Sequence, residues 1–259
     1  MTFPNFKGKH AEDSMFSPSD FLKYYKSIGK YPDYAVPEGM IICYQKSLME
    51  YIISNHKVTK VKGITSVGEM YLLDDTNKKI AVIGRFGIGS PVAVTLVEEF
   101  IAFGVKKFIT IGTAGTLQKN IKIGDLMVCE RAIRDEGTSH HYLKPSKYSY
   151  ASEEMTSKIK KSLEKLKKKY FVGTTWTVDA PYRETVSEAK HYQKEGVSTV
   201  EMEASALFAV AEYRKVELGA IFTISDSLAD LEWKPSFHHN KTQEGLETIY
   251  KVAVDSLLS

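Results

Sequence analysis

Three acidic side chains stand where the chain is otherwise apolar. The segment "VEMEASALF" at residues 200–208 places Glu201 and Glu203 at the start of an apolar run, and Asp226 follows another within "SDS". Burying an unpaired carboxylate costs several kcal/mol, so acids in such positions usually have a partner. A partly desolvated carboxyl such as Asp226 holds its proton more tightly, which suits a general acid. Capping of the next turn is the alternative role for Asp226.

Two glycine-containing segments supply backbone that a ligand can approach closely. They are "GRFGIGSP" at 84–91 and "TIGTAG" at 110–115. Ser90 followed by Pro91 is typical of a helix start, where free N–H groups attract an anion. The spacing of the glycines does not match a dinucleotide-binding fingerprint. A tight turn between a strand and a helix explains either segment equally well.

Aromatic and histidine side chains are further candidates. In "WTVDAPYRE" at 176–184, Tyr182 and Trp176 are able to stack on a flat ligand, although core packing is the default expectation for Trp176. The histidine pairs at 140–141 and 238–239 suggest a metal. Adjacent residues rarely coordinate one ion together, and no cysteine or carboxylate pattern completes such a site. We therefore predict no metal site.

Strands and helices that would position these residues alternate along the chain. Short apolar runs rich in β-branched residues predict buried strands; they lie at 39–44, 79–84, 106–112 and 218–225, with further candidates at 125–133 and 170–178. Helices are expected at 45–54, 91–103, 152–168, 201–214 and 242–258. This order predicts an α/β fold in which a central mixed, largely parallel twisted sheet is flanked by helices.

The predicted α/β domain spans residues 36–259, and residues 1–35 are expected to form an N-terminal arm with a helix near 18–28. In open α/β sheets, ligands bind at the carboxyl ends of the strands. Asp226 and both glycine segments follow predicted strands, and Glu201 and Glu203 stand at the start of a predicted helix, so we expect these groups to meet at that edge.

Composition limits the class of protein. The 259 residues are 43% hydrophobic with a formal net charge of +3, which is too small to indicate nucleic-acid binding. No apolar run approaches the roughly 18 residues that a membrane span needs, and the N-terminus lacks the apolar stretch of a signal peptide. The two cysteines, Cys43 and Cys129, lie in apolar strand-like settings. They favour a reduced, cytoplasmic protein over a disulfide framework.

The motifs together resemble one enzyme family. The order "GIGSP", "IGTAG", a strand ending in Asp179, "VEMEA" and "SD" is similar to the nucleoside phosphorylase-I family. That family includes hexameric purine nucleoside phosphorylases, uridine phosphorylases and methylthioadenosine nucleosidases. The resemblance covers roughly residues 40–258. It implies a nucleoside phosphorylase-like fold and cleavage of an N-glycosidic bond, foremost phosphorolysis of a purine nucleoside to free base and ribose-1-phosphate.

The resemblance also implies roles for individual residues. Glu203 would accept hydrogen bonds from the ribose 2′- and 3′-hydroxyls and stabilise positive charge on the sugar, with Met202 against the sugar and Glu201 in support. Asp226 would protonate, or hydrogen-bond to, N7 of the leaving purine. The remaining substrate-binding candidates are Thr113, Ala114, Gly115, Tyr182 and His239. Uridine phosphorylases generally lack the "SD", yet "EGTSHHYLKP" at 136–145 is closer to their sequences, so uridine stays open as the substrate.

The phosphate-binding arginines of the family are missing. The stretch "CYQKSLME" at 43–50 lacks the family's G-D-P-x-x-R, and Thr110 stands where a second arginine is expected. Arg85, Lys46 and Thr113 are the replacement candidates, with inorganic phosphate as co-substrate and no other cofactor. Two further alternatives stay open: a phosphate-independent nucleosidase that uses water, and a non-catalytic nucleoside-binding relative.

The resemblance also implies assembly. Family members are commonly hexamers in which a neighbouring subunit completes each pocket, so a homo-oligomer, foremost a hexamer, is expected here. His10 in the N-terminal arm is a weak candidate for such a contribution. Neither nucleic acid nor a membrane is expected as a partner.

Overall fold

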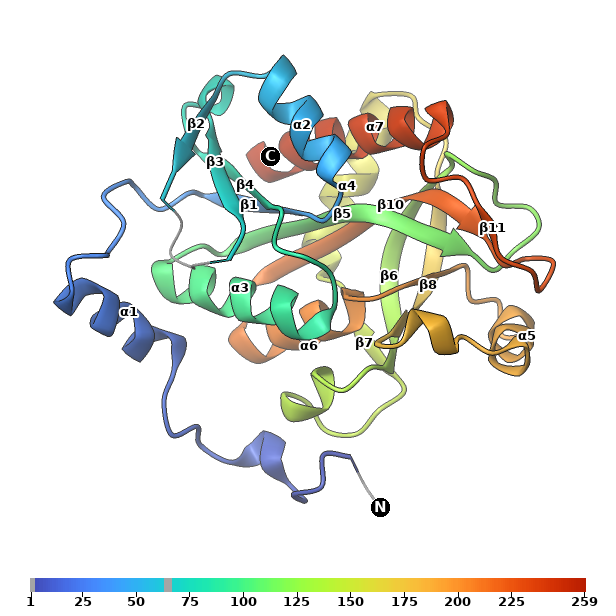
Figure 1. Cartoon of the computed structure of the whole chain (residues 1–259), viewed down its shortest axis with the longest axis horizontal. Coiled ribbons are helices and arrows are strands. Elements are labelled where there is room, and N and C mark those ends of the chain that lie inside the picture. The colour runs from blue at the N-terminus through green and yellow to red at the C-terminus, as the bar shows by residue number, and fades with distance from the viewer. Residues whose placement is uncertain (1–2, 63–66) are drawn as a thin grey trace.

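A mixed β-sheet runs through the centre of the molecule, with helices on both faces (Figure 1). The computed structural model describes residues 3–62 and 67–259. Within them the strands are β1 (Gly39–Cys43), β2 (Val58–Val61), β3 (Glu69–Leu73), β4 (Ile80–Gly84), β5 (Lys107–Thr116), β6 (Leu126–Asp135), β7 (Tyr148–Tyr150), β8 (Phe171–Val178), β9 (Thr199–Glu201), β10 (Glu217–Ser227) and β11 (Lys234–Pro235). The α-helices are α1 (Pro18–Ser27), α2 (Lys46–Asn55), α3 (Ser90–Phe103), α4 (Glu153–Lys165), α5 (Val186–Lys194), α6 (Ala204–Arg214) and α7 (Asn240–Leu258).

Strand β5 lies at the centre of the sheet and pairs with three other strands. It pairs in parallel with β1 on one side and with β10 on the other, and its far end also pairs antiparallel with β9. Because β10 continues through β6 and β8 to β9, these strands close into a ring, β5–β10–β6–β8–β9. The sheet extends beyond β1 through β4, β3 and β2. The carboxyl ends of β5 and β10 therefore lie side by side, paired from Glu217–Lys107 to Ser227–Thr116 with one shift of register between Ile224 and Asp226.

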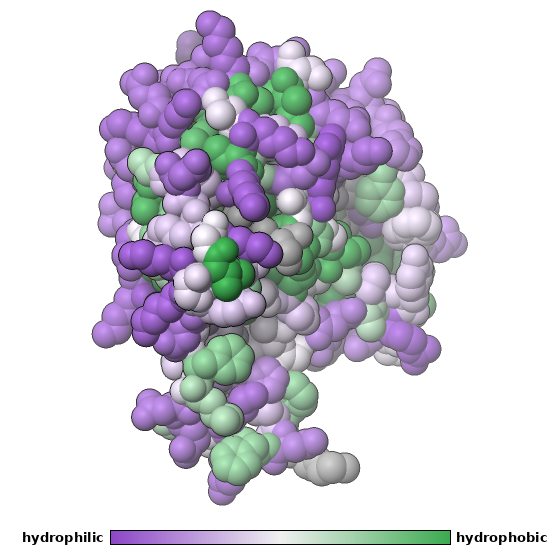
Figure 2. All heavy atoms as spheres, turned by 60° about the vertical axis from the view of Figure 1, so that its left-hand side comes forward, coloured by the Kyte–Doolittle hydropathy of each residue, from purple (hydrophilic) through white to green (hydrophobic). Residues whose placement is uncertain are grey.

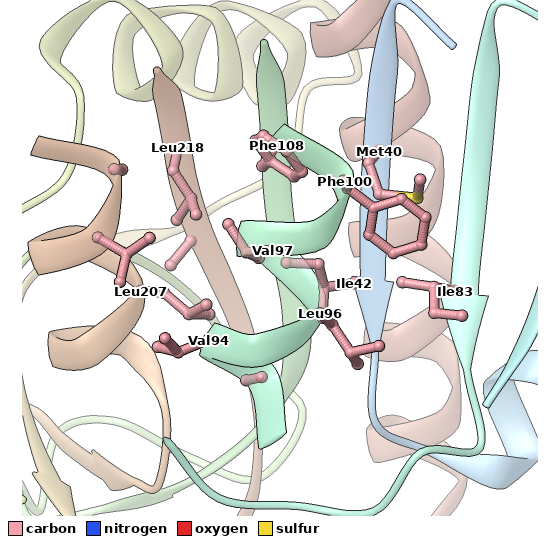
Figure 3. Close-up of a cluster of buried hydrophobic side chains, with 14 of the residues drawn as sticks. Met40, Ile42, Ile83, Val94, Leu96, Val97, Phe100, Phe108, Leu207 and Leu218 are labelled. Carbon is pink, nitrogen blue, oxygen red and sulfur yellow. The ribbon is translucent and has the colours of Figure 1, made fainter. Parts of the chain in front are cut away.

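Apolar side chains fill both faces of the sheet. Helices α3 and α6 cover one face, where α3 side chains such as Phe100 and Val97 pack over Met40 and Ile42 of β1 (Figure 3). Helices α2, α4 and α7 cover the other face in a second cluster that includes Ile249. Full burial of each such side chain stabilises the fold by about 1.5–3 kcal/mol. The two clusters hold the central strands between layers of helix.

Part of the N-terminal arm packs on the domain. Helix α1 lies against α3, and Leu22 joins the core cluster beneath it. The segment before α1 carries exposed large apolar side chains, among them Phe6 and Phe16. Figure 2 shows pale green, apolar residues on the projection at the lower edge of the molecule.

The α/β fold with a mixed sheet is confirmed, and each predicted strand and helix has a counterpart. The longest ladders, β5–β10 and β6–β8, are parallel, whereas the edges are antiparallel. The helix predicted from residue 201 begins at Ala204, because Glu201 ends β9 and Glu203 is the N-cap of α6. The short strands β2, β3, β7, β9 and β11 and the helix α5 were not predicted.

Candidate active site

A cavity of about 1030 Å³ opens beside the carboxyl ends of β5 and β10. Its volume is at the upper end of the range typical of small-molecule sites. The cavity brings together most of the sequence-predicted site residues, namely Thr113, Ala114 and Gly115 of β5, Glu201 of β9, Met202 and Glu203 before α6, Asp226 of β10, Lys46 of α2 and Tyr182. Segments more than 100 residues apart in the chain thus form one site, as expected for this edge of the sheet.

Glu203 joins the cavity to the glycine-containing loop between β4 and α3. Its Oε1 accepts a hydrogen bond of 2.6 Å from the backbone N–H of Gly89, and the residue is 7% exposed. Burial raises the pKa of Glu203 above its ordinary value, and the neighbouring Glu201 adds to the shift. Hydrogen bonds from the backbone N–H groups of Gly89 and Met202 oppose this shift, and the carboxyl lines the cavity, where a ligand can donate further hydrogen bonds to it.

Glu201 has a full set of protein partners. Its Oε1 accepts from the Thr177 hydroxyl at 2.5 Å, and its Oε2 accepts from the backbone N–H groups of Glu203 and Ala204 at 2.8 and 2.7 Å. Negative charge at a helix N-terminus is favourable, so Glu201 fixes the first turn of α6 and the backbone of Glu203. Burial still raises the pKa of Glu201. These contacts place Glu201 in a supporting position.

The loop that carries Gly89 has an unusual backbone. Arg85, Gly87 and Gly89 have φ values of 59°, 98° and 105°, a region that residues with a Cβ rarely adopt. Gly89 is the N-cap of α3, and the Ser90 hydroxyl donates to the Met202 carbonyl oxygen at 2.9 Å. Two hydrogen bonds therefore hold this loop against the segment that carries Met202 and Glu203.

Asp226 lies at the end of β10 and is 7% exposed. Its Oδ1 accepts from the Ser225 hydroxyl at 2.7 Å, and its Oδ2 accepts from the Trp233 indole N–H at 3.0 Å. Burial raises the pKa of Asp226, and these two hydrogen bonds oppose that shift. The result is a desolvated but well-oriented carboxyl that faces the cavity.

Aromatic side chains surround the cavity mouth. Tyr182, Trp233 and Phe237 line it, and both Tyr182 and Trp233 are largely exposed. Flat apolar surfaces of this kind suit an aromatic ligand. Trp176 is fully buried, and its indole N–H donates to Asp135 at 2.8 Å, so it belongs to the core as expected.

Arg85 lies outside the cavity, contrary to the expectation that it would face a phosphate there. Its guanidinium forms an ion pair with Glu69 at 2.8 Å and lies 3.9 Å from Glu50. The ion pair with Glu69 holds the side chain beside β3. None of the chain's five arginines lines the cavity, which leaves Lys46 and His238 as its basic residues within the described chain.

His239 is also not brought to the cavity. It is the N-cap of α7, where its Nδ1 accepts from the backbone N–H of Lys241 at 3.2 Å. Its neighbour His238 lines the cavity instead. The weak candidate His10 lies in the exposed 3₁₀ turn Lys9–Ala11, away from the cavity lining.

A polar pair occupies the wall next to α2. The Gln45 amide N–H donates to the Thr113 hydroxyl at 3.0 Å, and both residues line the cavity. The amide oxygen of Gln45 is buried and has no partner in the described structure. Thr110, where the family has an arginine, donates its hydroxyl proton to the Tyr44 hydroxyl at 3.1 Å. Neutral groups thus occupy the positions where guanidinium groups were expected.

Glu184 lines the cavity and was missed in the sequence. It is half-buried, and burial, followed by the charge of Asp226, raises its pKa to about 7. Among the described residues, none donates a hydrogen bond to its carboxyl or pairs with it as a cation. The signal was present in "YRET", where an acid precedes the threonine that caps α5.

The described residues hold neither a metal-binding cluster nor a membrane-spanning helix. In the described ranges 3–62 and 67–259, no three His, Cys, Asp or Glu side chains are grouped as a metal would need. Within the same ranges, no helix has the length and apolar character to cross a membrane.

Comparison with known proteins gives a family match and several relatives. The family model described as the phosphorylase superfamily matches residues 46–259. The chain is 29% identical over 174 residues to a purine nucleoside phosphorylase of Plasmodium vivax. The aligned residues make up 66% of this chain and 70% of the relative. It is 26% identical over 197 residues to a uridine phosphorylase of Haemophilus influenzae. The aligned residues make up 71% of this chain and 78% of that relative.

A solved structure has the same fold. The chain superposes on the purine nucleoside phosphorylase of Toxoplasma gondii in complex with immucillin-H with a TM-score of 0.76, at 21% identity, over 86% of this chain and 90% of the other. At this identity the similarity supports the fold alone. Purine and uridine enzymes are both among the relatives, as the mixed motifs in the sequence suggested.

Proposed function

Because the chain belongs to the phosphorylase superfamily, we propose that it is an enzyme that cleaves purine nucleosides with phosphate, releasing free base and ribose-1-phosphate. The observation that supports this reaction is that Glu203 and Asp226, the two carboxyls that it needs, lie in the same cavity. Both are buried, and each has at least one carboxylate oxygen held by the protein.

Glu203 would act on the sugar. Its carboxylate accepts hydrogen bonds from the ribose 2′- and 3′-hydroxyls, and its charge stabilises the oxocarbenium-like ribose as the C1′–N9 bond breaks. The bond from Gly89 fixes the carboxylate in advance, so little reorganisation is needed during the reaction.

Asp226 would act on the base. The electron pair of the breaking C1′–N9 bond moves into the purine ring, and a proton from Asp226 to N7 lets the base leave as a neutral molecule. Burial favours the protonated form that this step requires. The hydrogen bonds from Ser225 and Trp233 orient the carboxyl.

The phosphate co-substrate would bind where α2 begins. Lys46 and Ser47 of its first turn line the cavity beside the Gln45–Thr113 pair. Backbone N–H groups at a helix N-terminus and one ammonium group attract an anion, although less strongly than arginines do. An oxygen of this phosphate attacks C1′ and forms the new bond of ribose-1-phosphate.

Hydrolysis is the second candidate function, and one observation favours it. Six carboxyl-bearing residues line the cavity, against Lys46 and His238 as its basic residues within the described chain; the acids are Glu50, Glu184, Glu201, Glu203, Asp226 and Glu232. Such surroundings attract a phosphate dianion less strongly than an arginine-lined pocket does. Water would then replace phosphate as the nucleophile, with free ribose as the product.

One experiment separates the two reactions. A panel of guanosine, inosine, adenosine and uridine is incubated with the enzyme with and without inorganic phosphate, and base, ribose and ribose-1-phosphate are quantified. Phosphate-dependent formation of ribose-1-phosphate supports the proposal. Equal rates of base release with and without phosphate would replace it by hydrolysis, and absence of turnover would reject both.

We further propose that the chain assembles as a homo-oligomer, foremost a hexamer. Support comes from the exposed apolar side chains of the N-terminal arm, such as Phe6 and Phe16. Exposed apolar patches of this kind mark interaction surfaces. Sedimentation equilibrium of the full chain measures the assembly directly, and a monomer at micromolar concentration would contradict it.

A further inference from the structure

One buried hydroxyl connects the end of β8 to the segment that carries Glu203. Thr177 is fully buried in β8 and pairs with Glu201 of β9 in the parallel ladder between these strands. Its Oγ1 donates to Oε1 of Glu201 at 2.5 Å and accepts from the backbone N–H of Ser205 at 3.0 Å. Because a hydroxyl carries a single proton and the Ser205 N–H occupies one of its acceptor sites, that proton is given to Glu201.

Glu201 transmits this contact to the wall of the cavity. Its other oxygen, Oε2, accepts from the backbone N–H groups of Glu203 at 2.8 Å and Ala204 at 2.7 Å. The last torsion of a glutamate side chain has a broad energy minimum, so a carboxylate held at one oxygen alone can turn. The Thr177 hydroxyl holds the second oxygen and removes that freedom. The backbone of Glu203 therefore has a fixed partner only while this hydroxyl is present.

No other side chain takes over this contact in the part of the chain that the structure describes. There, Thr177 is the one side chain that donates a hydrogen bond to Glu201. Thr177 itself does not line the cavity, so it does not meet a ligand. Any effect of Thr177 on the reaction must pass through Glu201 to Glu203.

Resting on the proposed function, we propose that Thr177 is a positioning residue, whose hydroxyl holds Glu201 so that Glu203 meets the 2′- and 3′-hydroxyls of the ribose. A misplacement of about 1 Å in a group that contacts the substrate can lower the rate about 100-fold. Loss of the Thr177 hydroxyl should therefore be measurable at the sugar. Nucleosides that present both hydroxyls depend on it most.

The test is Thr177→Val, which removes the hydroxyl and keeps the β-branched shape. The substrates are inosine and 2′,3′-dideoxyinosine, which lacks both hydroxyls that Glu203 would bind. We expect kcat/KM for inosine to fall about 10-fold, with a much smaller loss for dideoxyinosine, so that the ratio of the two falls. Thr177→Ser retains a hydroxyl and should restore most of the ratio. Thr177→Ala removes the same hydroxyl without crowding and repeats the comparison if valine prevents folding.

The matched control is Thr175→Val. Thr175 lies two residues earlier on the same face of β8, is also fully buried, and donates to the backbone carbonyl oxygen of Thr199 in β9 at 3.2 Å. The control thus removes a hydrogen bond between the same two strands without touching Glu201. It should lower the melting temperature and leave the inosine-to-dideoxyinosine ratio unchanged. An unchanged ratio in Thr177→Val, or an equal fall in both variants, would overturn the inference and leave the proposed function standing.

Because the comparison concerns the sugar, it applies whether phosphate or water attacks C1′. If no nucleoside is cleaved, the proposed function falls, and calorimetric Kd values for the two nucleosides still decide the role of Thr177. Inosine binding about 10-fold weaker in Thr177→Val, with dideoxyinosine binding maintained, supports that role. An inosine Kd equal to that of the wild type, or no inosine binding by the wild type, rejects it.

Discussion

Each of the main carboxyls in the cavity has different protein partners, and this difference separates their chemistry. Glu201 accepts three hydrogen bonds and supports the backbone, Glu203 accepts from the backbone N–H groups of Gly89 and Met202, and Glu184 accepts none among the described residues. The fewer protein donors a carboxyl has, the more it depends on a ligand to satisfy it. Glu203 and Glu184 are therefore the acids whose substitution should change substrate handling most directly.

Replacing Glu203 with Gln tests the sugar contact. The amide has nearly the same size and retains an acceptor for the Gly89 N–H, but it removes the negative charge that would stabilise the cationic ribose. We expect kcat/KM to fall about 100–1,000-fold while the melting temperature stays near that of the wild type. Glu244→Gln, on the exposed side of α7, is the matched control. Near-normal turnover would show that position 203 does not stabilise the transition state.

Replacing Asp226 with Asn tests the proton donor. The side chain keeps an acceptor for the Trp233 indole N–H but has no proton to give to N7. For guanosine, kcat should fall about 100–10,000-fold. The control is a change of substrate: 7-methylguanosine already carries a positive charge and needs no proton to leave, so the variant should cleave it with a much smaller loss. Equal losses on both nucleosides would contradict the assigned role.

At the scale of elements, the loop between β4 and α3 is constrained by its own backbone. Gly89 has a φ of 105° and donates to Glu203, so loop conformation and carboxylate position are coupled. Gly89→Ala forces a Cβ into this conformation, at a cost of about 1–3 kcal/mol. We expect a lower melting temperature and a raised KM for the nucleoside.

Gly196→Ala provides the matched control for this prediction. Gly196 follows α5 with a φ of 76° and has open space around it, so alanine there also meets backbone strain at positive φ, but outside the cavity lining. It should lower the melting temperature without changing KM. A raised KM in both variants would show that loss of stability, not displacement of the loop, affects binding.

The sequence predicted elements best where one side of the chain is uniformly apolar. The central strands β1, β4, β5 and β10 and the helices α3 and α7 were found because their burial leaves continuous or periodic apolar residues. The short strands β9 and β11 owe their pairing to tertiary contacts with β5, β8 and β10, which no local pattern contains.

The sequence predicted those site residues that lie near the carboxyl ends of strands. Thr113, Glu203 and Asp226 were placed at one edge of the sheet, and the cavity contains all three. Arg85 was misplaced because its ion pair with Glu69 depends on the β3–β4 hairpin, whose β3 strand was not predicted. Glu184 was missed because a single acid before a helix cap looks like ordinary loop sequence until burial is known.

At the scale of the whole molecule, the cavity acids link stability to pH. Burial raises the pKa of Glu184 from 4.5 to about 7, so the folded protein binds this proton more tightly than the unfolded chain. Its contribution to the free energy of unfolding is therefore fully present below about pH 4.5 and is lost as the pH rises to about 7. The raised pKa values of Glu201 and Glu203 act in the same direction.

Chemical denaturation across this range measures the linkage. The wild type should lose about 1–2 kcal/mol more stability than Glu184→Gln between pH 5 and pH 8, after allowance for partial solvent screening of this half-buried group. Parallel curves for the two proteins would show that Glu184 titrates alike in the folded and unfolded states.

The chain contains two tryptophans in opposite surroundings. Trp176 is sealed in the core, whereas Trp233 is 63% exposed at the cavity mouth and holds Asp226 through its indole N–H. Only the second would sense whether the cavity is filled. The protein thus has a built-in fluorescent reporter: emission from the rim would shift as a base stacks nearby, against a constant signal from the interior, so occupancy can be followed in solution without a label.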